Sequence, residues 1–505
     1  MDLKKHDELL NGKNANQIDS SYNNGQAQER ILKNTSYLTI AFILQKILSF
    51  LYFVYIARYL GPVDLGLYDP VKSLIPIFLI LIDFSLSVVL VREIARDPNK
   101  TESYLGSVLG IKLIFALVVV LSMGLYTNFS NYSNIVKTVL YLDAVIVALD
   151  TFTLTFFAVF RGLQNMKFEA MGMIGTQILT IIFGVLSISL NWGLQALFIA
   201  VAAGSIFNFV FSLTMLIKKA KIRVTLRWDM EIIKKFMKFA LPFAIAAIFV
   251  KIYTYTDRFM LLKISGQSFV GWYVTAHKLT YALEFIPSAF AASIFPAMSY
   301  FFVHSRKDLA KTFEKAMHYL MVLSLPISIG IFVLADKIIL TMYGDVYETS
   351  IQPLRILIMG LIVVFLNFPV GAFLNACNKQ VVNTINMAII VVINVIINII
   401  LIPKYSLNGA AVAALISGIV LFFLGLRWIG KIVEYDKKKL INYLLKIFCA
   451  AALMGIVLLL LKNDLSIFIL MPLGAAVYFV LLYVFKGVNK NDIKTLYSSF
   501  ANKFL

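Results

Sequence analysis

The sequence has little of what a soluble enzyme or a disulfide-stabilised protein needs. Its 505 residues include two cysteines and four histidines, and only 14% of them are charged. Cys377 and Cys449 cannot build a disulfide framework, and neither the cysteines nor the histidines have the spacing of a metal site. We therefore expect no metal and no cofactor. The polar first 30 or so residues lack the apolar core of a signal peptide, so we expect a cytoplasmic tail there.

Apolar residues are abundant instead. They make up 60% of the chain, and the mean hydropathy is +0.84, which is more apolar surface than a soluble protein can cover. A spanning helix needs roughly 20 apolar residues, and about fourteen stretches of that kind occur. The sequence therefore predicts an all-α polytopic membrane protein with about 14 transmembrane helices.

The net charge of +19 is spread unevenly along the chain. Most Lys and Arg residues fall in segments that share the side of the N-terminus, which is the positive-inside bias of cytoplasmic segments. An even number of spans then puts both termini in the cytoplasm, and we expect a multi-pass protein of the cell (plasma) membrane. The basic stretch 218–238 indicates orientation beside anionic membrane lipids, and we expect no nucleic acid partner.

The opening part of the chain occurs twice. A stretch around Lys46 recurs 205 residues later, with Lys251 in the place of Lys46 and Gly266 in the place of Gly61. Six predicted spans separate the copies, so both begin on the same side of the membrane. The halves are then parallel repeats, related by a pseudo-twofold axis along the membrane normal. The sequence therefore predicts two six-helix lobes plus two extra helices.

This repeat predicts six parts of the chain. They are a cytoplasmic polar tail at 1–33, an N-lobe with spans 1–6 at 34–217, a basic cytoplasmic linker at 218–238, a C-lobe with spans 7–12 at 239–427, a linker with spans 13–14 at 428–485, and a cytoplasmic tail at 486–505. The last two spans fall outside the repeat.

Ionisable residues in the middle of the predicted spans are the candidate binding site. Lys46 and Lys251 lie at the centre of apolar helices, where an ionised side chain costs about 2.5–3.5 kcal/mol and so faces a partner or a wet cavity. Tyr255 and Arg258 share a helical face with Lys251. One interpretation is a cationic cavity between the lobes that holds an anion. Its substrate-binding residues would be Lys46, Lys251, Arg258, Lys278, Tyr255 and Tyr281.

The alternative interpretation is internal ion pairing that only fixes the packing. Lys46 would pair with Asp83, and Lys251 with Glu284. Arg258, near the outer end of its span, could instead extend its charge to the membrane surface.

Carboxylates in the spans are candidates for an ion-coupling site. Asp143 and Asp150 are seven residues apart on the fourth span and share a face. They could bind a coupling proton or sodium ion, or serve as counterions for Lys112. Asp83 and Asp257 are rivals for the same role.

The turn after the first span, Arg58-Tyr59-Leu60-Gly61-Pro62 with Gly66-Leu67-Tyr68 after it, resembles that of the polysaccharide-biosynthesis (O-antigen-type) flippases. These belong to the multidrug/oligosaccharidyl-lipid/polysaccharide exporter superfamily, and Thr256-Asp257-Arg258 is also similar to them. The second copy of the turn lacks the proline. The resemblance implies twelve core spans plus two, with spans 1, 2, 7 and 8 around a central cavity. It implies that Lys46, Asp83, Lys251, Asp257, Arg258, Lys278 and Glu284 lie at or near that cavity.

The resemblance also implies a function. The protein would carry a polyprenyl-(di)phosphate-linked oligosaccharide from the inner to the outer leaflet by alternating access. The transported glycan would serve cell-surface glycan or glycoprotein assembly, and glycan-assembly enzymes would be further partners. Lysine can hold the phosphate as a point charge. One alternative is an ion-coupled drug or metabolite exporter, which would favour a cavity of carboxylates. A second is a multispan glycosyltransferase or polymerase, which would want an acidic metal-binding pair. The sequence has no Asp-x-Asp, so we expect no enzyme.

Overall fold

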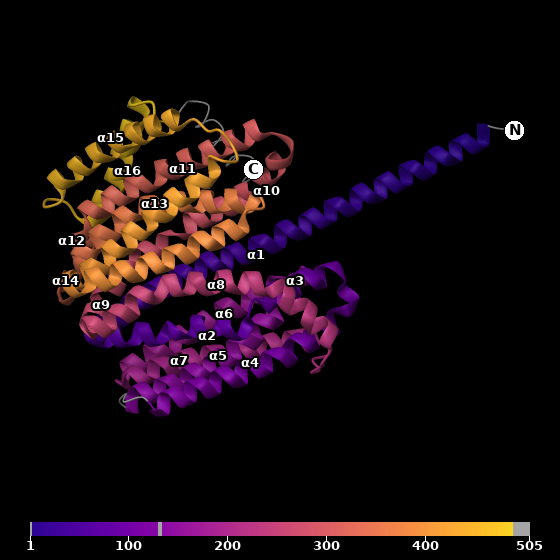
Figure 1. Ribbon diagram of the computed structural model, residues 1–505, viewed down its shortest axis with the longest axis horizontal. Helices are drawn as coiled ribbons and strands as arrows, with labels where there is room; N and C mark the ends of the chain where they lie inside the picture. The colour runs from indigo at the N-terminus through magenta and orange to yellow at the C-terminus, as the bar shows by residue number, and fades with distance from the viewer. Residues whose placement is uncertain (1–2, 130–133, 488–505) are drawn as a thin grey trace. The chain divides into compact units, whose positions relative to one another are not determined.

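The computed structural model describes the backbone of residues 3–129 and 134–487, and the side chains of these ranges from Tyr37 onward. Regular structure in this part of the chain is helical throughout, which confirms the predicted all-α class (Figure 1). The predicted C-terminal tail lies outside the described residues from 488 onward.

The helices follow one another with short connections. In the first half they are α1 (Leu3–Lys72), α2 (Leu74–Asp83), α3 (Leu86–Arg96), η1 (Pro98–Lys100), α4 (Thr101–Phe129), α5 (Asn134–Gly162), α6 (Lys167–Ser189), α7 (Gly193–Lys218) and α8 (Met230–Ile264). In the second half they are α9 (Gln267–Leu283), α10 (Phe285–His304), α11 (Arg306–Val333), α12 (Ala335–Tyr343), η2 (Asp345–Ser350), α13 (Ile351–Ala376), α14 (Gln380–Ile429), α15 (Lys437–Leu461) and α16 (Ile467–Val484).

Twelve helical segments of the described chain are long and apolar enough to cross a membrane. Two of these, Tyr37–Asp83 and Gln380–Ile429, contain an irregular residue, Gly61 at φ 68° and Ser406 at φ 50°. At 1.5 Å per residue, the 50 residues of α14 would reach about 75 Å, against a hydrocarbon core of about 30 Å. Each of the two therefore crosses twice, which agrees with the prediction of about 14 spans.

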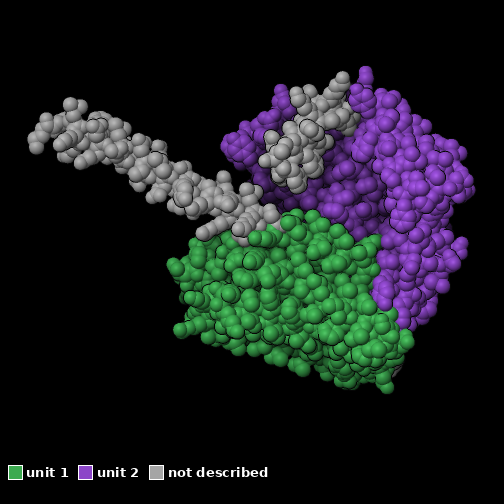
Figure 2. Space-filling model, turned by 180° about the vertical axis from the view of Figure 1, so that it is seen from behind, with its two compact units in different colours: residues 1–52, 74–248 green, residues 53–73, 249–505 purple. Residues whose placement is uncertain are grey.

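One compact unit contains residues 1–52 and 74–248 (Figure 2). Within it α7 packs on α5 and α6, and α4 packs on α5. On α4, Leu117, Leu121 and Leu125 are more than half exposed, as expected of side chains that face lipid. The connection before α8 contacts the start of α4, where the Arg227 N–H donates to the carbonyl of Gly106 (3.2 Å).

The other compact unit contains residues 53–73 and 249–505. Its core is formed by α13 against α14 and by α11 against α13 and α15. The sequence repeat assigns 53–73 to the N-lobe, whereas the packing assigns this segment to the unit of the second half. The bounds of the N-lobe and the C-lobe, which come from the sequence repeat, therefore stay a prediction.

The two extra spans, α15 and α16, are fixed to the second unit at both ends. Near the start of α15, the Lys439 ammonium lies 3.2 Å from the carboxylate of Glu314 on α11. Beyond its end, the Lys462 ammonium lies 2.9 Å from the carboxylate of Asp336 on α12. The extra pair is therefore tied to this unit by ion pairs as well as by apolar packing.

Candidate functional site

A buried arginine is the centre of the candidate site in the second unit. Arg258 on α8 is 8% exposed, and its guanidinium lies 3.0 Å from the carboxylate of Asp69 on α1. It also donates to the hydroxyl of Ser73 (3.1 Å) and lies 3.2 Å from Nδ1 of His277 on α9. Extension of Arg258 to the membrane surface, the alternative from sequence, is therefore wrong. Its charge is held inside the unit, and its Nε makes no hydrogen bond with the described residues.

Aromatic rings contact Arg258 and two lysines on α8 and α9. The Tyr255 ring centre is 5.2 Å from the Arg258 guanidinium and 6.0 Å from the Lys251 ammonium, as the predicted shared helical face requires. On α9, the Lys278 ammonium lies 5.1 Å from the ring of Phe53.

The aromatic series continues along α9. Tyr281 stacks on His277 with ring centres 6.1 Å apart. Of the six residues predicted to bind substrate, five therefore lie on α8 and α9, and Glu284 follows at the end of α9. The sixth, Lys46, belongs to the first unit and is exposed on α1.

Two glycines allow α1 and α9 to approach closely. A Cβ atom at Gly66 would lie 1.8 Å from the carbonyl oxygen of Gln267, and one at Gly271 would lie 1.9 Å from the carbonyl oxygen of Pro62. Gly66 and Gly271 are equivalent residues of the sequence repeat, and so are Pro62 and Gln267. The contact is thus reciprocal, as a twofold relation between the copies requires. It explains why the repeat keeps glycine at this position.

The arginine of the turn after the first span has a structural role. Arg58 donates from Nε to the carbonyl of Met342 (2.7 Å) and from a terminal nitrogen to that of Thr341 (2.5 Å). These carbonyls belong to the last turn of α12, where backbone acceptors lack helical partners. The Tyr347 hydroxyl in turn donates to the carbonyl of Ala57 (2.6 Å). Arg58 therefore joins this turn to α12, and Tyr347 joins it to η2.

A second buried polar network surrounds Asp257. Its carboxylate accepts from the Asn398 amide (2.6 Å) and from the Tyr273 hydroxyl (3.0 Å). Asn398 also donates to the side-chain carbonyl of Asn394 (3.0 Å), and the amide nitrogen of Asn394 donates to the Ser417 hydroxyl (3.3 Å). The sequence reasoning missed both asparagines, although two asparagines four residues apart in an apolar span were a visible signal. The network gathers carboxylate, amide and hydroxyl oxygens inside the second unit.

In the first unit, Asp83 pairs with a fully buried lysine. The Lys112 ammonium lies 2.5 Å from the Asp83 carboxylate and donates to the hydroxyls of Ser87 (2.9 Å) and Thr155 (2.5 Å). Lys112, rather than the Lys46 that one interpretation of the sequence suggested, is the cation seen beside Asp83.

The same contacts correct the counterion role of the fourth-span carboxylates. Asp83 neutralises Lys112, so Asp143 and Asp150 are not needed for that purpose. Asp143 is buried on α5, and the carboxyl of Asp150 interacts with the hydroxyl of Ser205 on α7.

This helical membrane fold is similar to those of a flippase and a multidrug transporter of known structure. The superposition with the lipid II flippase MurJ in an inward closed conformation covers 88% of this chain and 98% of that protein, with a TM-score of 0.74 and 20% identity. The superposition with an inward-facing multidrug resistance MATE family transporter covers 79% of this chain and 98% of that protein, with a TM-score of 0.65 and 16% identity. The chain belongs to the polysaccharide biosynthesis protein family, whose profile matches residues 31–302. The MatE profile matches residues 242–400.

Two relatives cover most of the chain. A probable low-salt glycan biosynthesis flippase, Agl15, of Haloferax volcanii is 26% identical over 384 residues, which is 75% of this chain and 79% of that protein. The capsular polysaccharide biosynthesis protein CapF of Staphylococcus aureus is 26% identical over 404 residues, which is 77% of this chain and 97% of that protein.

Proposed function

We propose that this protein is a flippase that carries a polyprenyl-(di)phosphate-linked oligosaccharide from the inner to the outer leaflet by alternating access. The observation that carries the proposal is the buried Arg258 with its unused Nε donor, which shares the Tyr255 ring with Lys251, while Lys278 lies on the neighbouring α9. Family membership and the names of the relatives support the same substrate class. The protein transports this substrate without converting it chemically.

The charge balance at Arg258 supplies a mechanism for coupling binding to movement. In the described state, the Asp69 carboxylate neutralises this arginine. A diphosphate linkage carries more negative charge than a carboxylate, and either a phosphodiester or a diphosphate offers acceptor oxygens, so the headgroup competes with Asp69 for the guanidinium. Binding of the headgroup would therefore weaken the ion pair between α1 and α8. A ligand that interacts differently with two states shifts the equilibrium between them.

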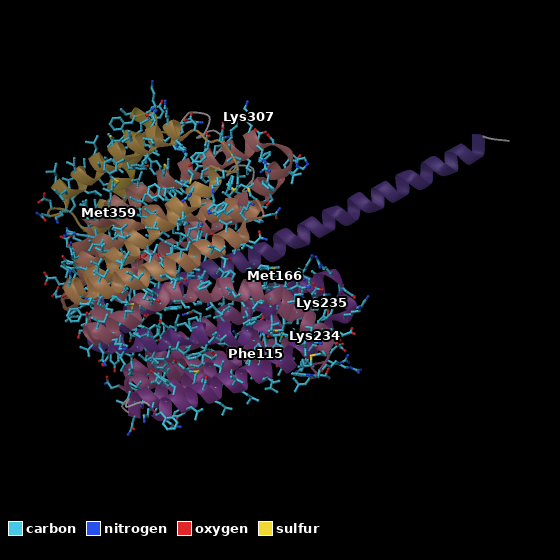
Figure 3. All side chains as sticks on the ribbon, viewed as in Figure 1. Phe115, Met166, Lys234, Lys235, Lys307 and Met359 are labelled. Atoms are coloured by element: carbon cyan, nitrogen blue, oxygen red, sulfur yellow. The ribbon has the colours of Figure 1, made fainter. Side chains whose placement is uncertain are left out.

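The cell membrane is the proposed location, with both termini in the cytoplasm. The basic residues before and at the start of α8 support this orientation, because cytoplasmic segments of membrane proteins carry an excess of Lys and Arg. Lys234 and Lys235 in the first turns of α8 belong to this group (Figure 3). Glycan-assembly enzymes that deliver or receive the lipid-linked glycan are the proposed partners.

A flipping assay in vesicles tests the proposal. With a labelled lipid-linked oligosaccharide, Lys251→Ala and Lys278→Ala are expected to slow translocation about tenfold or more, since each removes a cation that the phosphate would contact. Lys46→Ala tests the predicted substrate-binding role of the first-unit lysine in the same assay. Lys263→Ala is the matched control, because Lys263 is an exposed lysine at the end of α8. Unchanged translocation in the three variants would refute the proposed phosphate site.

A coupling ion is the second element of the proposal, and Asp257 is its ligand. Hard cations prefer carboxylate, carbonyl and hydroxyl oxygens, and the side-chain carbonyl of Asn398 beside Asp257 is buried without a hydrogen bond among the described residues. Asp257→Asn is therefore expected to abolish the response of transport to a sodium or proton gradient. Asp143→Asn and Asp150→Asn test the rival carboxylates in the same assay. Retained gradient dependence in Asp257→Asn would transfer the role to the rivals.

A further inference from the structure

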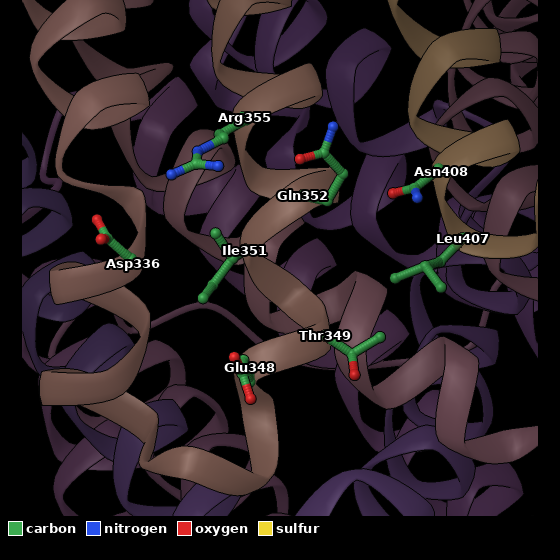
Figure 4. Close-up of a pocket in the computed structure, with 8 residues that line it drawn as sticks. All are labelled: Asp336, Glu348, Thr349, Ile351, Gln352, Arg355, Leu407 and Asn408. Carbon is green, nitrogen blue, oxygen red and sulfur yellow. The ribbon is translucent and has the colours of Figure 1, made fainter.

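A polar pocket lies in the second unit, apart from the cluster around Arg258. Its volume is about 470 Å³, within the range of about 300–1,000 Å³ that small-molecule sites have. It is an open pocket lined by residues of α12, η2, the start of α13 and the irregular turn of α14 (Figure 4). The lining residues are Asp336, Glu348, Thr349, Ile351, Gln352, Arg355, Leu407 and Asn408.

Three buried atoms of this lining have no hydrogen-bond partner in the described part of the chain. They are the Oδ1 atom of Asp336, the Nε atom of Arg355 and the Oδ1 atom of Asn408. Buried polar atoms are nearly always paired, so three unpaired atoms around one pocket indicate that a bound molecule or ordered water completes them. Two of the three accept hydrogen bonds and one donates.

This mixture of donors and acceptors selects among ligands. A phosphate offers only acceptors and would meet the carboxylates of Asp336 and Glu348. A metal cation would satisfy the oxygens but would be repelled by the guanidinium of Arg355. A hydroxyl group donates and accepts at once, so a ligand with several hydroxyls can pair with all three atoms without bringing a net charge.

The backbone around the pocket is also unusual. Ser406, two residues before Asn408, has φ 50° and ψ −126°, which is a sparsely populated conformation for a residue other than glycine. Such conformations persist where the surrounding structure enforces them, and they cluster at ligand sites. The η2 wall is held by the bond from Tyr347 to Ala57 and by a bond from the Trp272 indole to the carbonyl of Val346 (2.9 Å). The η2 wall of the pocket is therefore hydrogen-bonded to the turn after the first span.

We propose that this pocket is a second saccharide site, which takes a neutral hexose or N-acetylhexosamine of the transported glycan. The assignment to the transported glycan rests on the proposed flippase function, but sugar binding at the pocket does not. In a transport cycle the site holds the glycan by hydroxyl contacts while the phosphate contacts the cationic cluster on α8 and α9. Its sugar-contacting residues are Asp336, Gln352, Arg355 and Asn408.

Binding of free sugars to the full-length protein tests the site without any lipid carrier. Glucose, galactose, mannose, N-acetylglucosamine and N-acetylgalactosamine are offered at millimolar concentration to protein in a detergent without a sugar headgroup, and saturation-transfer NMR reports contact. Gln352→Trp should abolish transfer because the indole fills the pocket, and Gln352→Ala should weaken binding about fivefold by removing hydrogen bonds. Gln380→Trp is the matched control, since Gln380 is an exposed glutamine at the start of α14 in the same unit.

The outcomes separate this inference from the flippase proposal. Transfer to at least one sugar in the unmodified protein and in Gln380→Trp, with none in Gln352→Trp, supports the site. Absence of transfer to all five sugars, or transfer that survives in Gln352→Trp, overturns it. A thermal stabilisation by Mg²⁺ or Ca²⁺ that Gln352→Trp removes, without sugar transfer, assigns a cation site and also overturns it. Each of these results leaves the lipid flipping assay unaffected, so either proposal can fail alone.

Discussion

The buried ion pair of the first unit gives a quantitative prediction. Lys112 is fully buried, and its ammonium contacts the carboxylate of Asp83 and the hydroxyls of Ser87 and Thr155. Lys112→Met removes the cation and leaves the Asp83 carboxylate buried without its counterion. Loss of one partner of a buried pair costs about 3–5 kcal/mol, whereas replacement of both by apolar residues is often neutral. We expect the free energy of unfolding to fall by about that amount in Lys112→Met.

The double variant Asp83→Leu, Lys112→Met separates charge burial from packing. It is expected to recover most of the lost stability, because no uncompensated charge then remains. Unfolding in mixtures of detergent and dodecyl sulfate, followed by circular dichroism, measures each variant. Lys234→Met is the control at an exposed lysine of the same unit and should change stability by less than about 0.5 kcal/mol. A Lys112→Met protein as stable as the unmodified one, or a double variant as unstable as the single, would refute the reasoning.

Two further predictions concern packing and pH. Gly66→Ala should reduce the midpoint of thermal unfolding far more than Gly124→Ala. A Cβ atom at Gly66 would lie 1.8 Å from a backbone carbonyl oxygen, whereas one at Gly124 would have nothing within 4 Å. Equal midpoints in the two variants would contradict the close approach of α1 and α9. Burial would raise the pKa of Glu93 on α3, but hydrogen bonds from Lys235 and Arg92 outweigh it and hold this pKa below its usual value of 4.5. A carboxylate whose pKa is lowered on folding stabilises the fold at pH values above its usual pKa. This contribution is lost as the pH falls through the pKa of the folded state. Unfolding curves at neutral and acidic pH should therefore show that acid reduces the free energy of unfolding less in Glu93→Gln than in the unmodified protein. An identical reduction in both proteins would count against the pairing of Glu93 with Lys235 and Arg92.

Much of the fold could be predicted because it is encoded locally. Apolar runs of membrane-spanning length identify helices one at a time, and the spacing of Lys251, Tyr255 and Arg258 placed them on one face without knowledge of any neighbour. The register between the repeated copies makes Gly66 and Gly271 equivalent, but only the structure shows that their contact joins the two copies.

The partners of the charges could not be predicted in the same way. Lys112 meets Asp83 and Thr155 because α2, α4 and α5 pack together, and no local pattern records which helices become neighbours. Likewise, the sequence repeat gives no information on which unit residues 53–73 pack against. Asp69 was missed as the partner of Arg258 for this reason, since the two are far apart in the sequence.

The reciprocal contact between Gly66 and Gly271 has an evolutionary consequence. An ancestral chain of half this length, with one copy of the turn, could have met a second identical chain through the same glycine face, as in a symmetric homodimer. Duplication and fusion would then preserve that interface inside a single polypeptide. Divergence after fusion would remain constrained at these two positions, because a side chain added to either one collides with the backbone of the other copy.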